Sequence, residues 1–196
     1  MEGALFISSA RIILLNKGPF LVLATQNPID QEGTYSLPEA QIDRFMLKVL
    51  IDYPDKTQEL EILKKNTFQK PETIKAVINC EQLALMGELI DQIYVDEKLK
   101  EYIVDLVSST RQPEKYGMDV DQYIEYGASP RATIFLAKAA RVNAFLSNRA
   151  YITPQDIKIV GPDVLRHRII LSFEAEAEDI VSDDIIQTMF DSVEVP

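Results

Sequence analysis

The apolar pattern of this 196-residue chain changes character once, near Tyr53–Asp55. Before that point, Pro19–Thr25 and Phe45–Ile51 are nearly continuous apolar runs of strand length, which is typical of strands buried on both faces. After it, apolar residues recur with helical spacing. We therefore predict a small α/β part at residues 1–54 and a helical part at residues 55–196, with a mostly helical fold overall.

Local signals predict where the elements lie. Residues 4–15 hold two β-prone runs, which predict a hairpin or one long strand. Asp55 with Gln58 forms a capping box, and Ser129-Pro130 is also a helix start. Further helices are expected near 81–92, 96–110, 161–172 and 182–191, and Thr153-Pro154 is another helix start. The helix that begins at Pro130 is expected to turn Ile134, Phe135, Ala139, Val142 and Leu146 inward.

Charge and composition exclude several classes of function. The net charge is −11, and after Phe173 the chain has eight carboxylates with no Lys or Arg, which argues against nucleic-acid binding. One cysteine, Cys80, and one histidine make a His/Cys metal site improbable, so no metal ligand is assigned. The chain has no apolar run long enough to span a membrane, and no export signal is recognised. A cytoplasmic location is therefore expected.

Two polar residues beside the expected strands are candidates for catalysis. Asn27 follows the first apolar run, where ligands of α/β sheets bind, so it can orient a water or touch a phosphate; it can instead cap the loop before Pro28. Arg44 precedes the second run. Its guanidinium can pair with a surface carboxylate or act as an arginine finger on a neighbouring subunit.

Arg131 is the candidate for ligand binding. It lies in the first turn of the helix that Ser129 caps, where a cation opposes the helix dipole unless an anion joins it. That anion is either a ligand or a nearby carboxylate. Tyr94–Glu97 imitates a magnesium-binding strand end but more simply starts a helix, and His167, between two arginines, is expected at a surface or interface.

No phosphate-binding loop of the form G-x-x-x-x-G-K-[ST] occurs among the seven glycines. That loop supplies the backbone N–H groups and the lysine that hold the β- and γ-phosphates of a nucleotide. We therefore expect this chain alone neither to bind nor to hydrolyse ATP.

Two blocks, Pro19–Lys48 and Gly127–Ala175, resemble the MoxR branch of the AAA+ ATPases. The resemblance implies a truncated AAA+ core at residues 1–54 and a C-terminal helical lid. By position it implies that Asn27 is the sensor-1 residue, Arg44 the arginine finger and Arg131 the sensor-2 arginine. It further implies ATP and Mg as cofactors of the full-length protein only, a hexameric ring of subunits, and an unknown client protein for chaperone-like activation.

The chain also departs from the family pattern. Walker A and Walker B are absent, and the strand that would lie between the two apolar runs is missing, so both runs would lack a partner. The N-terminal half is therefore either supplied separately or lost by truncation. Two alternatives to the ATPase function remain, a non-enzymatic interaction module and a non-functional gene fragment.

Overall fold

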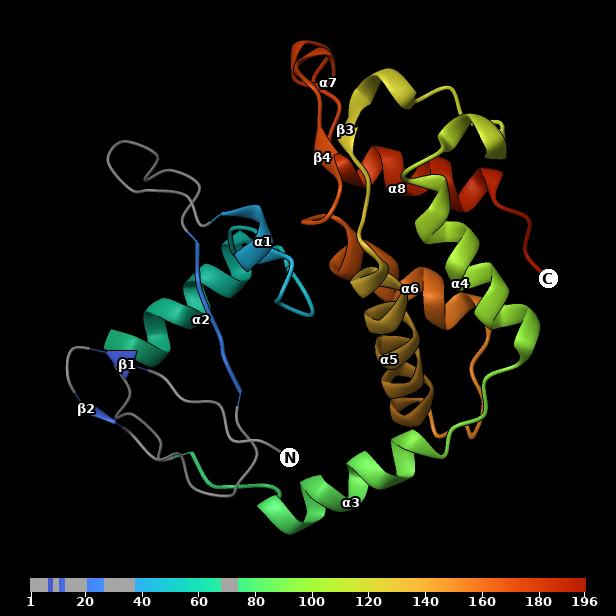
Figure 1. Ribbon diagram of the computed structural model, residues 1–196. Coiled ribbons are helices and arrows are strands. Elements are labelled where there is room, and N and C mark those ends of the chain that lie inside the picture. Colours follow the sequence, from blue (N-terminus) through green and yellow to red (C-terminus); the bar gives the residue numbers. More distant parts are fainter. Residues whose placement is uncertain (1–6, 9–10, 13–20, 27–37, 68–73) are drawn as a thin grey trace. The chain divides into compact units, whose positions relative to one another are not determined.

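The computed structural model describes residues 7–8, 11–12, 21–26, 38–67 and 74–196 (Figure 1). By packing, the chain divides into two compact units. One combines Met1–Tyr35 with Glu72–Leu89, and the other combines Ser36–Pro71 with Ile90–Pro196. The predicted fold class, mostly helical with a lid-like bundle, is confirmed.

In the first unit, a hairpin is formed by β1 (Ile7–Ser8) and β2 (Arg11–Ile12), which pair antiparallel. Of the two readings of residues 4–15, the hairpin is therefore the one found in the described residues. Most of α3 (Cys80–Asp91) also belongs to this unit. Its start is a capping box that joins the backbone and side chains of Asn79 and Gln82.

The two apolar runs are not strands among the described residues. Residues 21–26 and 47–55 have no regular secondary structure, and Leu23 and Ile51 are 85 % and 91 % exposed. A strand needs a neighbour to take its backbone hydrogen bonds, and an apolar run alone cannot supply one. The runs therefore have the composition of buried strands without the partners that would bury them.

The second unit is organised around four helices, α4 (Glu97–Ser109), α5 (Pro130–Leu146), α6 (Pro154–Leu165) and α8 (Ser182–Ser192). Helix α5 packs against α4 and α6, and α8 packs against the same two helices. Their largest fully buried side chains fill one core: Ile103, Leu106, Val107, Leu136, Ile157, Val164, Leu165, Ile185, Ile186 and Met189.

The face that α5 buries differs from the prediction. Ile134, Val142 and Leu146 are exposed, and of the five residues expected inside only Ala139 is fully buried. The reason is size, because α5 lies closely against α6 and a close helix contact selects small side chains. The buried residues of α5 are Ala132, Leu136, Ala139, Ala140 and Ala144.

A two-stranded antiparallel sheet, β3 (Ile124–Tyr126) and β4 (Ile170–Leu171), completes the second unit, and Figure 1 shows the two strands side by side. The helix expected at 161–172 is wrong, because α6 continues through Pro162 to Leu165 and β4 follows. The shorter elements are α1 (Glu39–Ile42), α2 (Lys56–Thr67), α7 (Phe173–Ala177) and two 3₁₀ turns, Pro113–Tyr116 and Asp121–Tyr123.

The predicted helix starts are confirmed by their hydrogen bonds. Asp55 and Gln58 bond reciprocally at the start of α2, and the Asp96 carboxylate accepts from the Lys98 N–H at the start of α4. Asp96 is therefore a helix cap, as expected of the Tyr94–Glu97 segment. Ser129 caps α5 by accepting from the Arg131 N–H.

Candidate functional site

The three predicted site residues have different outcomes. Asn27 lies outside the described residues. Arg44 is exposed, and its guanidinium has no carboxylate partner among the residues that the structure describes. Arg131 is 45 % exposed at its side chain and pairs with Asp43, with 2.6 Å between Nη1 and Oδ2. The anion that offsets the helix dipole at Arg131 is thus, in this structure, a carboxylate of the same chain.

Asp43 is the centre of a polar cluster that sequence reasoning did not identify. Its Oδ1 accepts from Arg168 Nε at 2.9 Å, its Oδ2 accepts from Arg131, and the Ser129 hydroxyl lies 3.2–3.3 Å from both oxygens. Because Asp43 precedes Arg44 directly, the cluster joins the Asp-Arg-Phe element to the start of α5. We call these four residues, Asp43, Ser129, Arg131 and Arg168, the Asp43 cluster.

The β3–β4 sheet brings the two arginines of the cluster together. Strand β3 leads directly into Gly127–Arg131, and β4 begins two residues after Arg168. Pairing Tyr126 with Ile170 therefore places the start of α5 beside the segment that follows α6. The two arginines are 37 positions apart in the chain, so no local spacing in the sequence reveals that they bind the same carboxylate.

The junction between β3 and α5 is fixed to the end of α4. Thr110 Oγ1 accepts from the Ala128 N–H at 2.9 Å, and Arg111 Nη1 donates to the Ala128 carbonyl at 2.7 Å. A Cβ on Gly127 would lie 2.2 Å from the Thr110 carbonyl oxygen, so only glycine fits there. These contacts set the position from which Ser129 and Arg131 reach Asp43.

The backbone after Asp43 is held by the run Arg166-His167-Arg168. Arg168 Nη2 donates to the carbonyls of Asp43 and Phe45, at 2.9 and 2.5 Å, and Nη1 donates to Met46. His167 Nε2 lies 3.1 Å from the Phe45 carbonyl. Three further contacts extend the attachment, from Arg166 Nη1 to the Lys48 carbonyl, from the Lys48 N–H to the Asp163 carbonyl, and from the Arg168 guanidinium to the Phe135 ring.

His167, expected at a surface or interface, is half-buried in this arrangement. Burial, together with the neighbouring Arg168 and Lys48 charges, lowers the pKa of His167 to about 4. The imidazole is therefore neutral at pH 7, and Nε2–H donates to the Phe45 carbonyl. Its role in the structure is to attach the segment that carries Arg44.

The two ion pairs of Asp43 differ in strength because they differ in exposure. Arg168 is 1 % exposed, so leaving it without a carboxylate partner would cost about 3–5 kcal/mol. Arg131 is nearly half-exposed, and a pair of that kind contributes about 0.2–1 kcal/mol. Asp43 thus holds Arg168 tightly and Arg131 loosely.

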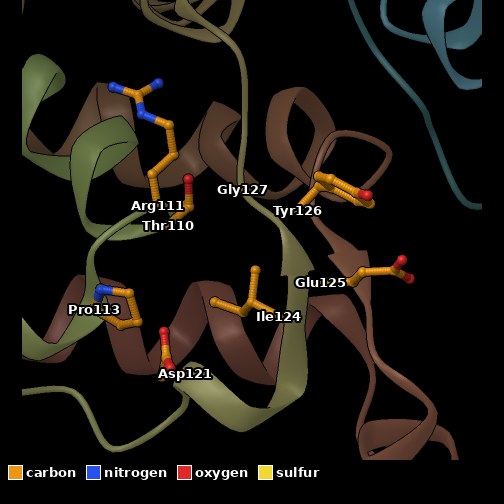
Figure 2. Close-up of a pocket in the computed structure, with 8 residues that line it drawn as sticks. All are labelled: Thr110, Arg111, Pro113, Asp121, Ile124, Glu125, Tyr126 and Gly127. Carbon is orange, nitrogen blue, oxygen red and sulfur yellow. The ribbon is translucent and has the colours of Figure 1, made fainter.

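Two hollows lie near these residues. The smaller, about 180 Å³, is lined at the Asp43 cluster by Asp43, Ser129 and Arg168. The larger, about 340 Å³, lies beside Thr110 and Gly127, and neither Arg44 nor Arg131 lines it. Figure 2 shows that Arg111 extends away from the lining carboxylates Asp121 and Glu125, in keeping with its bond to Ala128. The smaller hollow therefore adjoins the Asp43 cluster, but it too is lined by neither Arg44 nor Arg131.

Within the described ranges, no group of three or more His, Cys, Asp or Glu side chains could hold a metal ion. None of the helices in those ranges is long and apolar enough to cross a membrane. The exposed guanidinium of Arg131 suits an anionic ligand, because guanidinium groups bind phosphate and carboxylate oxygens.

Comparison with known proteins identifies the family. Residues 4–47 match a family described as "ATPase family associated with various cellular activities (AAA)", and residues 117–189 match an AAA lid domain. The curated relatives include Chaperone MoxR1 of Mycobacterium tuberculosis, which is 41 % identical over 91 % of this chain and 47 % of its own length. The chain belongs to the MoxR-type AAA+ ATPases.

Two further relatives show how far this MoxR-type similarity extends. The uncharacterized protein YeaC of Bacillus subtilis is 40 % identical over the whole chain and 58 % of its own length. A crystal structure of a candidate ATPase from Cytophaga hutchinsonii is 42 % identical and has a TM-score of 0.89 over 98 % of this chain and 58 % of that one. The chain thus spans about half the length of the relatives it matches, ending with the lid domain.

Proposed function

We propose that this chain is the sensor and lid portion of a MoxR-type ATPase subunit that hydrolyses ATP in a ring, with nucleotide bound between subunits. In this proposal, Arg131 contacts the phosphates of a bound nucleotide as the sensor-2 arginine. Arg44 acts on the nucleotide of the neighbouring subunit as the arginine finger, and Asn27 orients the attacking water as the sensor-1 residue.

The observation that carries the proposal is the Asp43 cluster. It joins the Asp-Arg-Phe element to the first turn of α5, so two elements expected at the nucleotide are attached to each other through one carboxylate. Arg44 remains exposed beside this contact, and Arg131 is held only weakly. Both guanidinium groups are therefore accessible to a polyphosphate.

ATP with Mg would supply the phosphoryl group and the metal charge, and the residues of this chain would supply stabilisation of the transferring phosphate. An arginine finger contributes about 10³–10⁵ in kcat when it neutralises charge that develops in the transition state. A ring of six subunits would place Arg44 where it can neutralise this charge. Such a protein would act in the cytoplasm on a client protein, in a chaperone-like manner.

Mixing variant subunits tests the assignment of Arg44 and Arg131. In the intact protein that includes the nucleotide-binding half, Arg44→Ala and Arg131→Ala should each lower kcat/KM for ATP by about 10³-fold or more. When the two variant proteins are mixed and reassembled, hydrolysis reappears only if Arg44 and Arg131 of one chain act on different nucleotides, so the mixture also shows whether they serve the same one. The rate of phosphate release is the measurement, and rings formed from each variant alone are the controls.

Two results would contradict the assignment. Unchanged turnover in Arg44→Ala rings would remove the finger role. Unchanged turnover in Arg131→Ala rings would remove the sensor-2 role.

A polypeptide of these 196 residues is expected to have no measurable affinity for ATP, because none of its glycines belongs to a phosphate-binding loop. Two accessible arginines cannot replace that loop, since exposed ion pairs contribute little in water. Calorimetric titration with ATP and magnesium measures the affinity. Binding in the micromolar range would overturn this expectation.

A further inference from the structure

The short helix α7 presents an aromatic ring to solvent with carboxylates beside it. Phe173, its first residue, is 83 % exposed. Glu174 and Glu176 are exposed as well, and neither has a cationic partner in the ranges that the structure describes. Large aromatic side chains are frequent anchors of protein interfaces, because burying them removes much apolar surface from water. We call these three residues, Phe173, Glu174 and Glu176, the α7 knob.

The backbone that carries the knob is held firmly. Ala175 is fully buried on the inner side of α7, and the Glu178 carboxylate accepts a hydrogen bond from the Tyr123 hydroxyl at 2.8 Å. Asp179, which follows α7, has a φ of 58°, and this left-handed conformation costs a residue other than glycine about 1 kcal/mol. A ring displayed from a fixed backbone loses little conformational freedom on binding, so Phe173 is suited to be an interface anchor.

The outward face of α5 has the complementary character. Beyond the first turn, Ile134, Lys138 and Val142 recur at four-residue intervals, and Arg141 lies on the same side of the helix. Ile134 is 54 % exposed, and α5 contains no acidic residue. The buried Nε of Arg141 has no hydrogen-bond partner within the described part of the chain. We call these four residues, Ile134, Lys138, Arg141 and Val142, the α5 stripe.

The knob and the stripe leave the β3–β4 sheet at opposite ends. Strand β3 runs into α5 after Tyr126, and β4 runs into α7 after Leu171. Antiparallel pairing puts Leu171 beside Ile124, at the start of β3, so α7 begins at the end of the sheet that is remote from α5 (Figure 1). The two complementary surfaces are therefore arranged to meet between two copies of the chain and not within one.

We propose that the α7 knob of one copy docks on the α5 stripe of a second copy of this chain. Phe173 packs against the two apolar members of the stripe, and the two carboxylates of the knob pair with its two cations. Because the knob and the stripe are different surfaces, the contact is heterologous, and each copy can bind two neighbours. This contact between lids goes beyond the ATPase function proposed above and requires no nucleotide.

Sedimentation velocity of the 196-residue chain, over a range of concentrations, measures the contact. The exposed apolar residues at 21–26 and 47–51 offer a second route to self-association, and salt separates the two routes. Ion pairs weaken as salt screens them, so Kd for docking of the knob should rise about tenfold between roughly 0.05 and 0.5 M sodium chloride. A chain that stays monomeric at low salt, or associates equally well at both salt concentrations, overturns the proposal.

Phe173→Ala tests the aromatic anchor. Loss of a central aromatic side chain should raise Kd about thirtyfold or more. The matched control is Val104→Ala, because Val104 on α4 is also an exposed apolar residue, at 50 %, but belongs to neither surface. Its Kd should equal that of the wild type. Equal values of Kd for Phe173→Ala and the wild type overturn the role of the knob.

Charge reversal followed by rescue tests which surfaces meet. Glu174→Lys with Glu176→Lys reverses the knob, and Kd should rise about tenfold or more because like charges then face each other. Lys138→Glu with Arg141→Glu reverses the stripe and should have the same effect. A chain that carries all four substitutions regains opposite charges and should associate about as tightly as the wild type. Weak association of this fourfold variant overturns the pairing of these two surfaces.

The control for charge reversal is Glu101→Lys with Glu114→Lys. Both residues are exposed and lie outside the knob and the stripe, and their substitution changes the net charge by the same amount. Its Kd should remain within about twofold of the wild type, because a distant charge is screened. Thermal unfolding midpoints identify variants that do not fold, and Lys138→Glu alone gives the readout for the stripe if the double substitution is one of them. A control that weakens association as much as the reversed knob overturns the proposal.

Discussion

Asp156 illustrates how a single buried charge can hold several chain segments. It is 1 % exposed and accepts hydrogen bonds from Asn143 on α5, from Arg149 on the loop after it and from Thr153 at the start of α6. Burial alone would raise the pKa of Asp156, but these hydrogen bonds outweigh it and keep the pKa well below its ordinary value. The carboxylate is therefore ionised in the folded state at every pH near neutrality.

Asp156→Asn should lower the free energy of unfolding by about 3 kcal/mol, because the buried hydrogen-bond donors around the side chain would lose the carboxylate charge that accepts from them. The matched control is Asp184→Asn. Asp184 occupies the corresponding position of α8 and accepts from the Val181 N–H, but it is exposed, so its loss should cost about 1 kcal/mol or less. Denaturant unfolding at neutral pH measures both, and equal losses would contradict the role of burial.

At the scale of elements, the crossing of α6 and α8 depends on one glycine. A Cβ at Gly161 would lie 2.3 Å from Cζ of Phe190, whose ring is buried against α6. Gly87 of α3 offers the opposite case, since nothing lies within 4 Å of a Cβ placed there. The same substitution should therefore have opposite effects in the two helices.

Gly161→Ala should destabilise the helical bundle by about 1–3 kcal/mol, because the added methyl displaces a packed ring. Gly87→Ala should stabilise α3 by about 0.5–1 kcal/mol, the difference in helix propensity between the two residues. Denaturant unfolding reports the first effect, and hydrogen exchange of the α3 amides reports the second. A stabilised Gly161→Ala variant would show that the two helices can separate at little cost.

The sequence predicted helices where capping residues mark their starts, as at Asp55, Asp96 and Ser129, because a cap acts within three residues of itself. It did not predict β3 and β4, which are two or three residues long and pair across more than forty positions. It misjudged α5 because alanine is scored as weakly apolar, although close helix packing selects it. The Asp43 cluster was missed for the same physical reason as the sheet, since its contacts join residues 86–125 positions apart.

At the scale of the whole molecule, the half-buried His167 and the buried Asp156 set separate pH ranges for stability. The ordinary pKa of histidine is about 6.5, and that of His167 is lowered to about 4 in the folded chain. The unfolded chain therefore binds the proton more readily, so the contribution of His167 is fully present above pH 6.5 and is lost as the pH falls toward 4. The contribution of Asp156, whose pKa is lowered, is lost only at still lower pH.

His167→Gln should flatten the dependence of stability on pH between about 6.5 and 4. Its side-chain amide can still donate to the Phe45 carbonyl but takes up no proton. The midpoint of thermal unfolding, measured across this range for the wild type and the variant, checks the expectation. Parallel curves for the two proteins would show that His167 is not the group responsible.

The Asp43 cluster also determines how the protein can be dissected by deletion. The change in apolar pattern near Tyr53–Asp55 invites expression of the helical part from residue 55 onward, but the carboxylate that neutralises Arg168 lies upstream of that point. A fragment started there would retain a buried guanidinium with neither its counter-ion nor the carbonyls of Asp43, Phe45 and Met46. A shortened version designed for crystallography or binding assays should therefore begin no later than Pro38, ahead of α1.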